Sequence, residues 1–134
     1  MTLNIEERNL IVRNRLQKAH ETFKETKGIA EMHYWHSAAN RLYYACYYAV
    51  SALLIKNGYN ARTHNGVFNL LGKHFIVTGI ISNEQNKLYR KLFDLRQNGD
   101  YDDWIVVGES DIVPLLEPAE KFIAEIERLI TFND

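Results

Sequence analysis

A long apolar segment in the middle of the chain limits the possible folds more than any other feature. Every residue from Leu42 to Ile55 is apolar or aromatic except Ser51. The segment is shorter than the roughly 20 residues that a membrane-spanning helix needs. A helix that is apolar on several faces must be covered by other elements. We therefore expect a helix over about 32–57 at the centre of a helical fold.

Apolar residues recur at helical spacing in four further segments. The first begins with the capping-box pair Asn4 and Glu7 and should run to about Lys27, where Gly28 is expected to end it. The other three are a short helix capped by Thr63 and ended by Thr78–Gly79, a helix that starts at Ser82 and ends at Asn98–Gly99, and a last helix that begins between Ser110 and Pro118.

Five helices without a sheet predict an all-α fold, an antiparallel up-and-down bundle in one domain over 1–134. Only Trp104–Gly108, between the last two helices, has the character of an extended segment. Cys46 lies among tyrosines and is expected to fill space in the core. The N-terminus has no apolar core like that of a signal peptide, so we expect a cytoplasmic protein that does not enter a membrane.

The formal net charge is -1, so any attraction for nucleic acid must come from a local basic patch. Two short motifs and one histidine are candidates for function. Asn40-Arg41-Leu42-Tyr43-Tyr44-Ala45 lies inside the central helix, His64-x-Gly66 follows it, and Arg96-x3-Asp100-Tyr101 lies where the fourth helix is expected to end.

The order of these motifs resembles the small bacterial and archaeal members of the HEPN family, over about residues 3–131. The resemblance implies a helical bundle that commonly dimerises. Many HEPN domains are metal-independent ribonucleases with an Arg-x4-6-His signature, and they often act as toxins beside a nucleotidyltransferase antitoxin. Possible partners are therefore a second copy of the chain, a nucleotidyltransferase, and RNA or a nucleotide.

This chain departs from that signature. Counting from Arg96, the histidine should fall among Tyr101, Asp102 and Asp103. Metal-free RNA cleavage needs a proton acceptor and donor with a pKa near neutrality, and the pKa of tyrosine is about 10. We therefore favour a binding or regulatory module with Arg41, Tyr44, Arg96, Asp100 and Tyr101 in its site. In related toxin and antitoxin pairs the partner adenylylates a tyrosine near the signature, so Tyr101 is the expected modification site.

Two alternatives stay open. In the first, the protein is a ribonuclease in which Arg96 stabilises phosphate charge and His64, or a residue of a second protomer, transfers the proton. In the second, the protein is a structural helical dimer, and Arg96 only interacts with a helix C-terminus.

The remaining histidines carry weaker signals. Arg15 and His20 also have the spacing of the signature, but five helical steps separate their side chains by about 140°, so we expect His20 to pair with neighbouring charges. His33 and His36 have no evident third ligand. We therefore expect neither a metal nor another cofactor.

Overall fold

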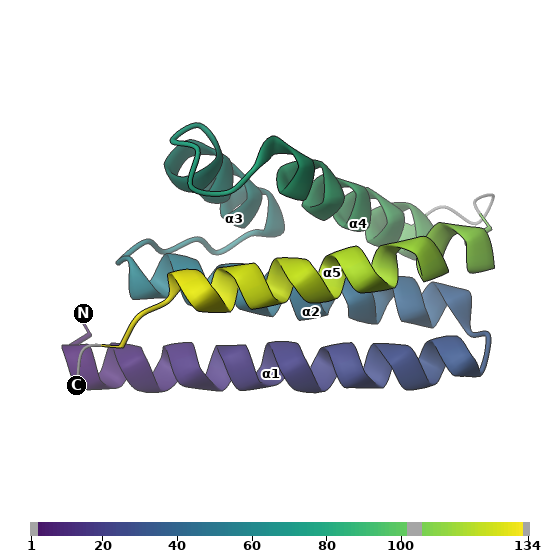
Figure 1. Cartoon of the computed structure of the whole chain (residues 1–134), viewed down its shortest axis with the longest axis horizontal. Coiled ribbons are helices and arrows are strands. Elements are labelled where there is room, and N and C mark those ends of the chain that lie inside the picture. The colour runs from purple at the N-terminus through teal and green to yellow at the C-terminus, as the bar shows by residue number, and fades with distance from the viewer. Residues whose placement is uncertain (1–2, 102–105, 133–134) are drawn as a thin grey trace.

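A computed structural model of the chain describes residues 3–101 and 106–132, with only the backbone of 99–101. In these two stretches the chain forms five α-helices and no strand, which confirms the predicted all-α fold. The elements are α1 (Ile5–Glu31), α2 (Trp35–Lys56), α3 (His64–Leu71) with the π-helical turn η1 (Gly72–Ile76), α4 (Asn83–Tyr101) and α5 (Glu109–Leu129) (Figure 1).

The helix α2 lies at the centre of the bundle, as its apolar sequence predicts. It packs against α1, α3, α4 and α5. In Figure 1, α1 runs below α2, and α3 and α4 lie above it. A column of stacked rings connects three helices through the core, because Tyr43 of α2 stacks on Tyr89 of α4 and Tyr89 stacks on Phe122 of α5. Cys46 is fully buried beside this column, where burial raises the pKa of its thiol, so it fills space as expected.

Three of the predicted helix ends are present in detail. Asn4 and Glu7 form both bonds of the capping box that begins α1. The Thr63 Oγ1 atom accepts a hydrogen bond of 2.9 Å from the Gly66 amide and caps α3. Gly58, directly after α2, has a φ of 83°, which a glycine adopts with little strain. The turn at Gly58 lies between α2 and α3.

Three predicted boundaries are wrong. The helix α1 continues through Gly28 to Glu31, and α4 continues through Gly99 to Tyr101, so Arg96 is not in the last turn. A glycine inside a helix costs only about 1 kcal/mol, which packing against neighbouring helices can offset. The last helix begins at Glu109, one residue before the predicted window, and includes both prolines.

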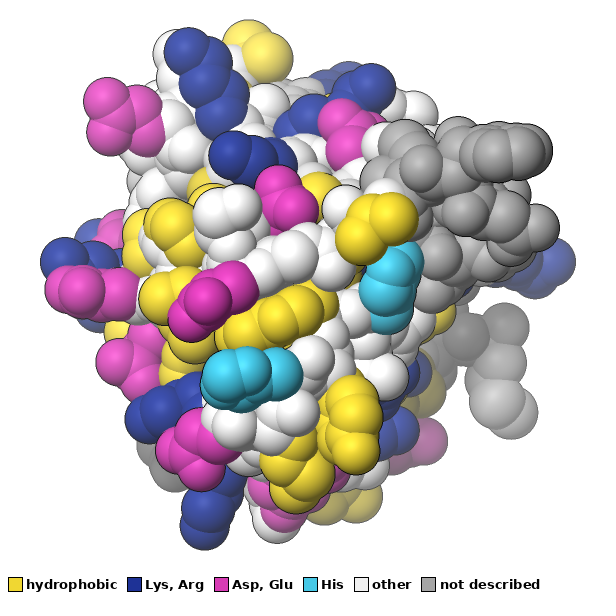
Figure 2. Space-filling model, turned by 90° about the vertical axis from the view of Figure 1, so that its right-hand side faces the viewer, with side chains coloured by type: hydrophobic (Ala, Val, Ile, Leu, Met, Phe, Trp, Pro, Cys, Tyr) yellow, Lys and Arg dark blue, Asp and Glu magenta, His cyan; other side chains and the backbone are white. Residues whose placement is uncertain are grey.

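The end of the bundle that contains the α1–α2 turn carries hydrophobic and histidine side chains on its surface (Figure 2). Of the extended segment predicted before α5, 102–105 lie outside the described residues, and 106–108 have no regular structure. No helix in the part of the chain that the structure describes has the length and apolar character needed to cross a bilayer.

Candidate functional site

The hydroxyl group of Tyr44 lies between a guanidinium and an imidazole that are far apart in the sequence. The Nη2 atom of Arg96 donates to this oxygen at 3.3 Å. The Nε2 atom of His64 lies 3.5 Å from the same oxygen, at the edge of hydrogen-bond distance. The two nitrogens therefore cannot be farther apart than the sum of these distances, and both groups can reach one phosphate.

Three helices supply these side chains. Tyr44 belongs to the partly exposed stripe of α2, and Arg96 extends towards it from α4. His64 is the first residue of α3, so the Thr63 cap fixes the point from which its ring extends. The turn at Gly58 brings that helix start back over α2. All three side chains are half-buried.

Further tyrosines surround the imidazole. Its Nδ1 atom is hydrogen-bonded to the Tyr43 hydroxyl at 2.8 Å, and the centroid of its ring lies 4.7 Å from that of Tyr47. The guanidinium carbon of Arg96 lies 5.6 Å from the ring centroid of Tyr43 and 5.4 Å from that of Tyr44. Such cation–π contacts hold the cation over the tyrosines without neutralising its charge.

The electrostatics of the site keep its imidazole neutral near pH 7. Burial, and then the positive charge of Arg96, lower the pKa of His64 from its ordinary value. Burial raises the pKa of Tyr43 to about 12, so its hydroxyl keeps its proton at neutral pH. A neutral imidazole beside a guanidinium can accept a proton, and the guanidinium can hold an anion.

A second arginine lies against the same tyrosine. The guanidinium carbon of Arg41 is 5.0 Å from the ring centroid of Tyr44. Its Nε and Nη2 atoms donate to Asn40 Oδ1 at 3.1 and 2.9 Å. The ring of Tyr44 therefore contacts two cations, Arg41 and Arg96.

The structure brings four of the predicted site residues together: Arg41, Tyr44, His64 and Arg96. The side chains of the other two, Asp100 and Tyr101, lie outside the described residues, although their backbone continues α4 beyond Arg96. Tyr43 lies inside one of the motifs and Tyr47 just beyond it, but the sequence did not predict their contacts with His64. Their position on the same helix as Tyr44, one residue before it and three after it, was the available signal.

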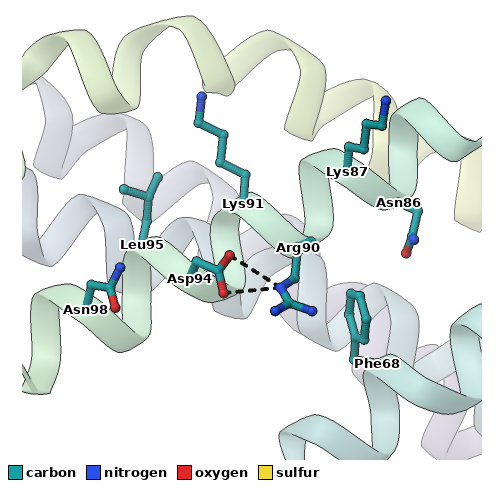
Figure 3. Close-up of a pocket in the computed structure, with 8 residues that line it drawn as sticks. All are labelled: Phe68, Asn86, Lys87, Arg90, Lys91, Asp94, Leu95 and Asn98. Carbon is teal, nitrogen blue, oxygen red and sulfur yellow. Dashed lines mark hydrogen bonds and ion pairs between the residues drawn. The ribbon is translucent and has the colours of Figure 1, made fainter.

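A cleft of about 470 Å³ lies on the surface of α4 (Figure 3). Three cations line it, but Nε of Arg90 is 3.3 Å from both carboxylate oxygens of Asp94, and this pair offsets one of the charges. Phe68 of α3 forms part of the wall. Neither Arg96 nor His64 lines this cleft. The volume of a cleft alone therefore does not identify the candidate site.

The other histidines have local contacts. His20 Nε2 lies 2.9 Å from a carboxylate oxygen of Glu127, which confirms the predicted pairing with a charge. His33 stacks on Trp35, and His36 accepts a long hydrogen bond from the Val107 amide. Among the described residues, no three His, Cys, Asp or Glu side chains gather as a metal site would require.

The comparisons with known proteins agree with this fold. A family model described as HEPN domain matches residues 12–129. The chain is 34% identical to a UPF0332 protein of Thermotoga maritima, over 92% of this chain and 94% of that protein. It is 25% identical to a Methanocaldococcus jannaschii protein named "Putative toxin MJ0142", over 86% of this chain and 78% of that one.

A solved structure shares the architecture. The crystal structure of TT1696 from Thermus thermophilus superimposes with a TM-score of 0.74, at 17% identity, over 87% of this chain and 96% of that one. At this identity the likeness concerns the fold alone. The match over 12–129 and the relatives that align along nearly the whole chain together place the protein in a family: the chain belongs to the HEPN domain family.

Proposed function

We propose that the protein is a toxin-like regulatory HEPN module that binds RNA or a nucleotide through the phosphate at Arg96. One observation carries the proposal: the Tyr44 hydroxyl contacts both the Arg96 guanidinium and the His64 imidazole. A guanidinium can bind a phosphate with two parallel hydrogen bonds. The Tyr44 hydroxyl and the second cation, Arg41, add a donor and a positive charge at the same place.

Titration of a fluorescent single-stranded RNA tests this function through its anisotropy. Replacing Arg96 by alanine removes charge-assisted hydrogen bonds worth about 1.5–3 kcal/mol, so we expect affinity to fall about tenfold or more. Arg96→Lys keeps the charge without the two parallel donors. Its affinity for the RNA should lie between those of the wild type and Arg96→Ala. Equal affinity of wild type and a folded Arg96→Ala variant, with lower thermal stability of the variant, would instead support the purely structural role.

The regulatory part of the proposal concerns a partner. Two Methanocaldococcus jannaschii relatives have names that describe them as toxins, and the family resemblance implies a nucleotidyltransferase antitoxin. We propose that such a partner adenylylates Tyr101, which follows Arg96 on α4. Incubation with the cognate nucleotidyltransferase and ATP should add an adenylyl mass to the wild type and not to Tyr101→Phe. An unchanged intact mass of the wild type would contradict this part.

We also propose that the module is a homodimer, as is common in the family. A dimer contact near α2 would bring two Arg96 side chains towards one nucleic acid. Light scattering during size-exclusion chromatography should give twice the mass of the chain. A mass equal to one chain at micromolar concentration would contradict the dimer without affecting the phosphate site.

A second function, metal-independent cleavage of RNA, is favoured by the lowered pKa of His64 beside Arg96. A neutral imidazole can take the proton of a ribose 2′-hydroxyl while the guanidinium stabilises charge on the phosphate. His64 then replaces the histidine that the signature lacks. Cleavage of an RNA pool in EDTA, abolished in both Arg96→Ala and His64→Ala, would support this activity. Intact RNA after incubation with the wild type would leave binding as the function.

A further inference from the structure

We propose that a cleft between α1 and the end of α2 binds a second phosphate of the same single-stranded RNA, with Arg8 and Arg15 as the binding side chains. The inference rests on the proposed function of the Arg96 site and extends it from one phosphate to a path for a polynucleotide. It assigns a role to residues outside both of the motifs that the sequence singled out.

The cleft has a volume of about 420 Å³, within the range of small-ligand sites. One wall comes from the N-terminal part of the chain and the other from the end of α2 and the residues after it. No acidic side chain among the described residues lines it. The lining residues are Leu3, Arg8, Ile11, Arg15, Ile55, Gly58, Tyr59 and Asn60.

The two arginines are placed to act together. Arg8 and Arg15 are two helical turns apart on α1, so their side chains share one face, and their Cα atoms lie about 10 Å apart along the axis. Both are half-buried, and neither has an ion pair with a described residue. The Nη1 atom of Arg8 lies 3.7 Å from the position that a Cβ on Gly58 would occupy. The guanidinium therefore lies close to the backbone just after α2.

The cleft connects with the site at Arg96. A smaller cavity of about 110 Å³ shares Arg15, Tyr59 and Asn60 with it and is also lined by Tyr47. The ring of Tyr47 in turn contacts His64, which shares the Tyr44 hydroxyl with Arg96. Shared lining residues and ring contacts therefore form a path of side chains from Arg8 past Arg15 and Tyr47 to Arg96.

The chemistry of this path suits single-stranded RNA. Proteins that bind single strands combine cations that follow the backbone with aromatic rings on which bases stack. Here the cations are Arg8 and Arg15, and half-buried tyrosines lie beside them at 47 and 59. With a net charge of -1, these local cations have to supply the attraction for phosphate. A ligand with one phosphate reaches one end of the path, whereas a longer strand reaches both.

Fluorescence anisotropy with two labelled RNAs tests the inference. One is a dinucleotide that reaches only the Arg96 site, and the other has about twelve nucleotides. For Arg8→Ala/Arg15→Ala we expect unchanged affinity for the dinucleotide and an affinity for the longer RNA at least about tenfold lower. The slope of log affinity against log salt for the longer RNA should fall by about 0.7, which is the contribution of one phosphate contact on a single strand.

A matched control removes the same charge elsewhere. Lys87→Ala/Lys91→Ala changes two cations on the cleft of α4 (Figure 3) and should leave both affinities unchanged. If the arginine variant melts at a lower temperature than the wild type, Arg8→Gln/Arg15→Gln replaces it, since glutamine keeps much of the length and removes only the charge. The salt slope is a further safeguard, because a loss of stability alone would not change it.

The outcomes separate the two proposals. If wild type binds both RNAs and the arginine variant binds the longer one equally well with the same salt slope, the second phosphate site is wrong and the Arg96 site stands. If only the lysine control loses affinity, the strand follows α4 instead, and the inference is again wrong. If wild type binds neither RNA, the proposed function fails and the inference fails with it.

Discussion

At the scale of single residues, the Tyr44 hydroxyl that lies between Arg96 and His64 defines the candidate site. The signature histidine is absent after Arg96, yet an imidazole from another helix lies beside the same tyrosine hydroxyl. His64 precedes Arg96 in the sequence and belongs to a separate helix, so the sequence does not show that both side chains lie beside Tyr44. A proton acceptor can therefore be supplied from a different element than the one in which the family signature places it.

Removal of the Arg96 charge should change the titration of His64. Burial and the charge of Arg96 lower the pKa of this imidazole, so Arg96→Ala should raise it. Titration of histidine ring signals by NMR measures the change, and the signal lost in His64→Ala identifies the residue. An unchanged pKa would show that the two groups do not interact as their geometry implies.

The same pKa shift affects stability. In the unfolded chain the pKa of His64 is near its ordinary value of about 6.5, so the unfolded state binds more protons than the folded state just below that pH. The free energy of unfolding should therefore fall as the pH drops from about 6.5 through the lowered pKa of His64. Chemical denaturation at several pH values should show this fall, and His64→Gln should remove it. If the free energy of unfolding falls equally in the wild type and in His64→Gln, titratable groups other than His64 cause the fall.

At the scale of elements, the start of α3 matters because it positions His64. Thr63 caps this short helix by accepting a hydrogen bond from the Gly66 amide. Thr63→Ala should lower the free energy of unfolding by about 1 kcal/mol and weaken RNA binding, whereas Thr63→Ser keeps the hydroxyl and should retain both. Denaturation and anisotropy measure the two effects. Unchanged stability and affinity in Thr63→Ala would mean that other contacts hold α3 in place.

The elements also show where sequence reasoning succeeds and fails. The caps at Asn4 and Thr63 depend on residues within one turn, so local sequence predicts them. The ends expected at Gly28 and Gly99 were wrong because a glycine inside a helix costs only about 1 kcal/mol. Beyond Gly28, the buried side chain of Ala30 offsets this cost. The early start of α5 has a similar cause. Its buried residue Ile112 packs into a second cluster with Ala38 and Ala39 of α2, and no local pattern reveals that contact.

At the scale of the whole molecule, the central position of α2 was predictable, because a helix that is apolar on several faces needs neighbours on several sides. The sequence indicated the residues of the site one by one, but not that they lie together. Periodicity shows which residues share a face of a helix, but not which helices meet, so the contact of Tyr44 with Arg96 required the structure. The cleft at Arg8 and Arg15 was missed for the same reason, since its two walls come from the first part of α1 and the end of α2, which are far apart in the sequence.

The central claim is that a phosphate binds where Arg96, Tyr44 and His64 meet, and NMR titration with a short single-stranded RNA tests it most directly. If a phosphate binds there, the Arg96 Nε–H signal and the His64 ring signals should shift together and saturate with the same dissociation constant. Unchanged signals of both residues at saturating RNA, with shifts confined to the cleft around Lys87 and Lys91 (Figure 3), would contradict it.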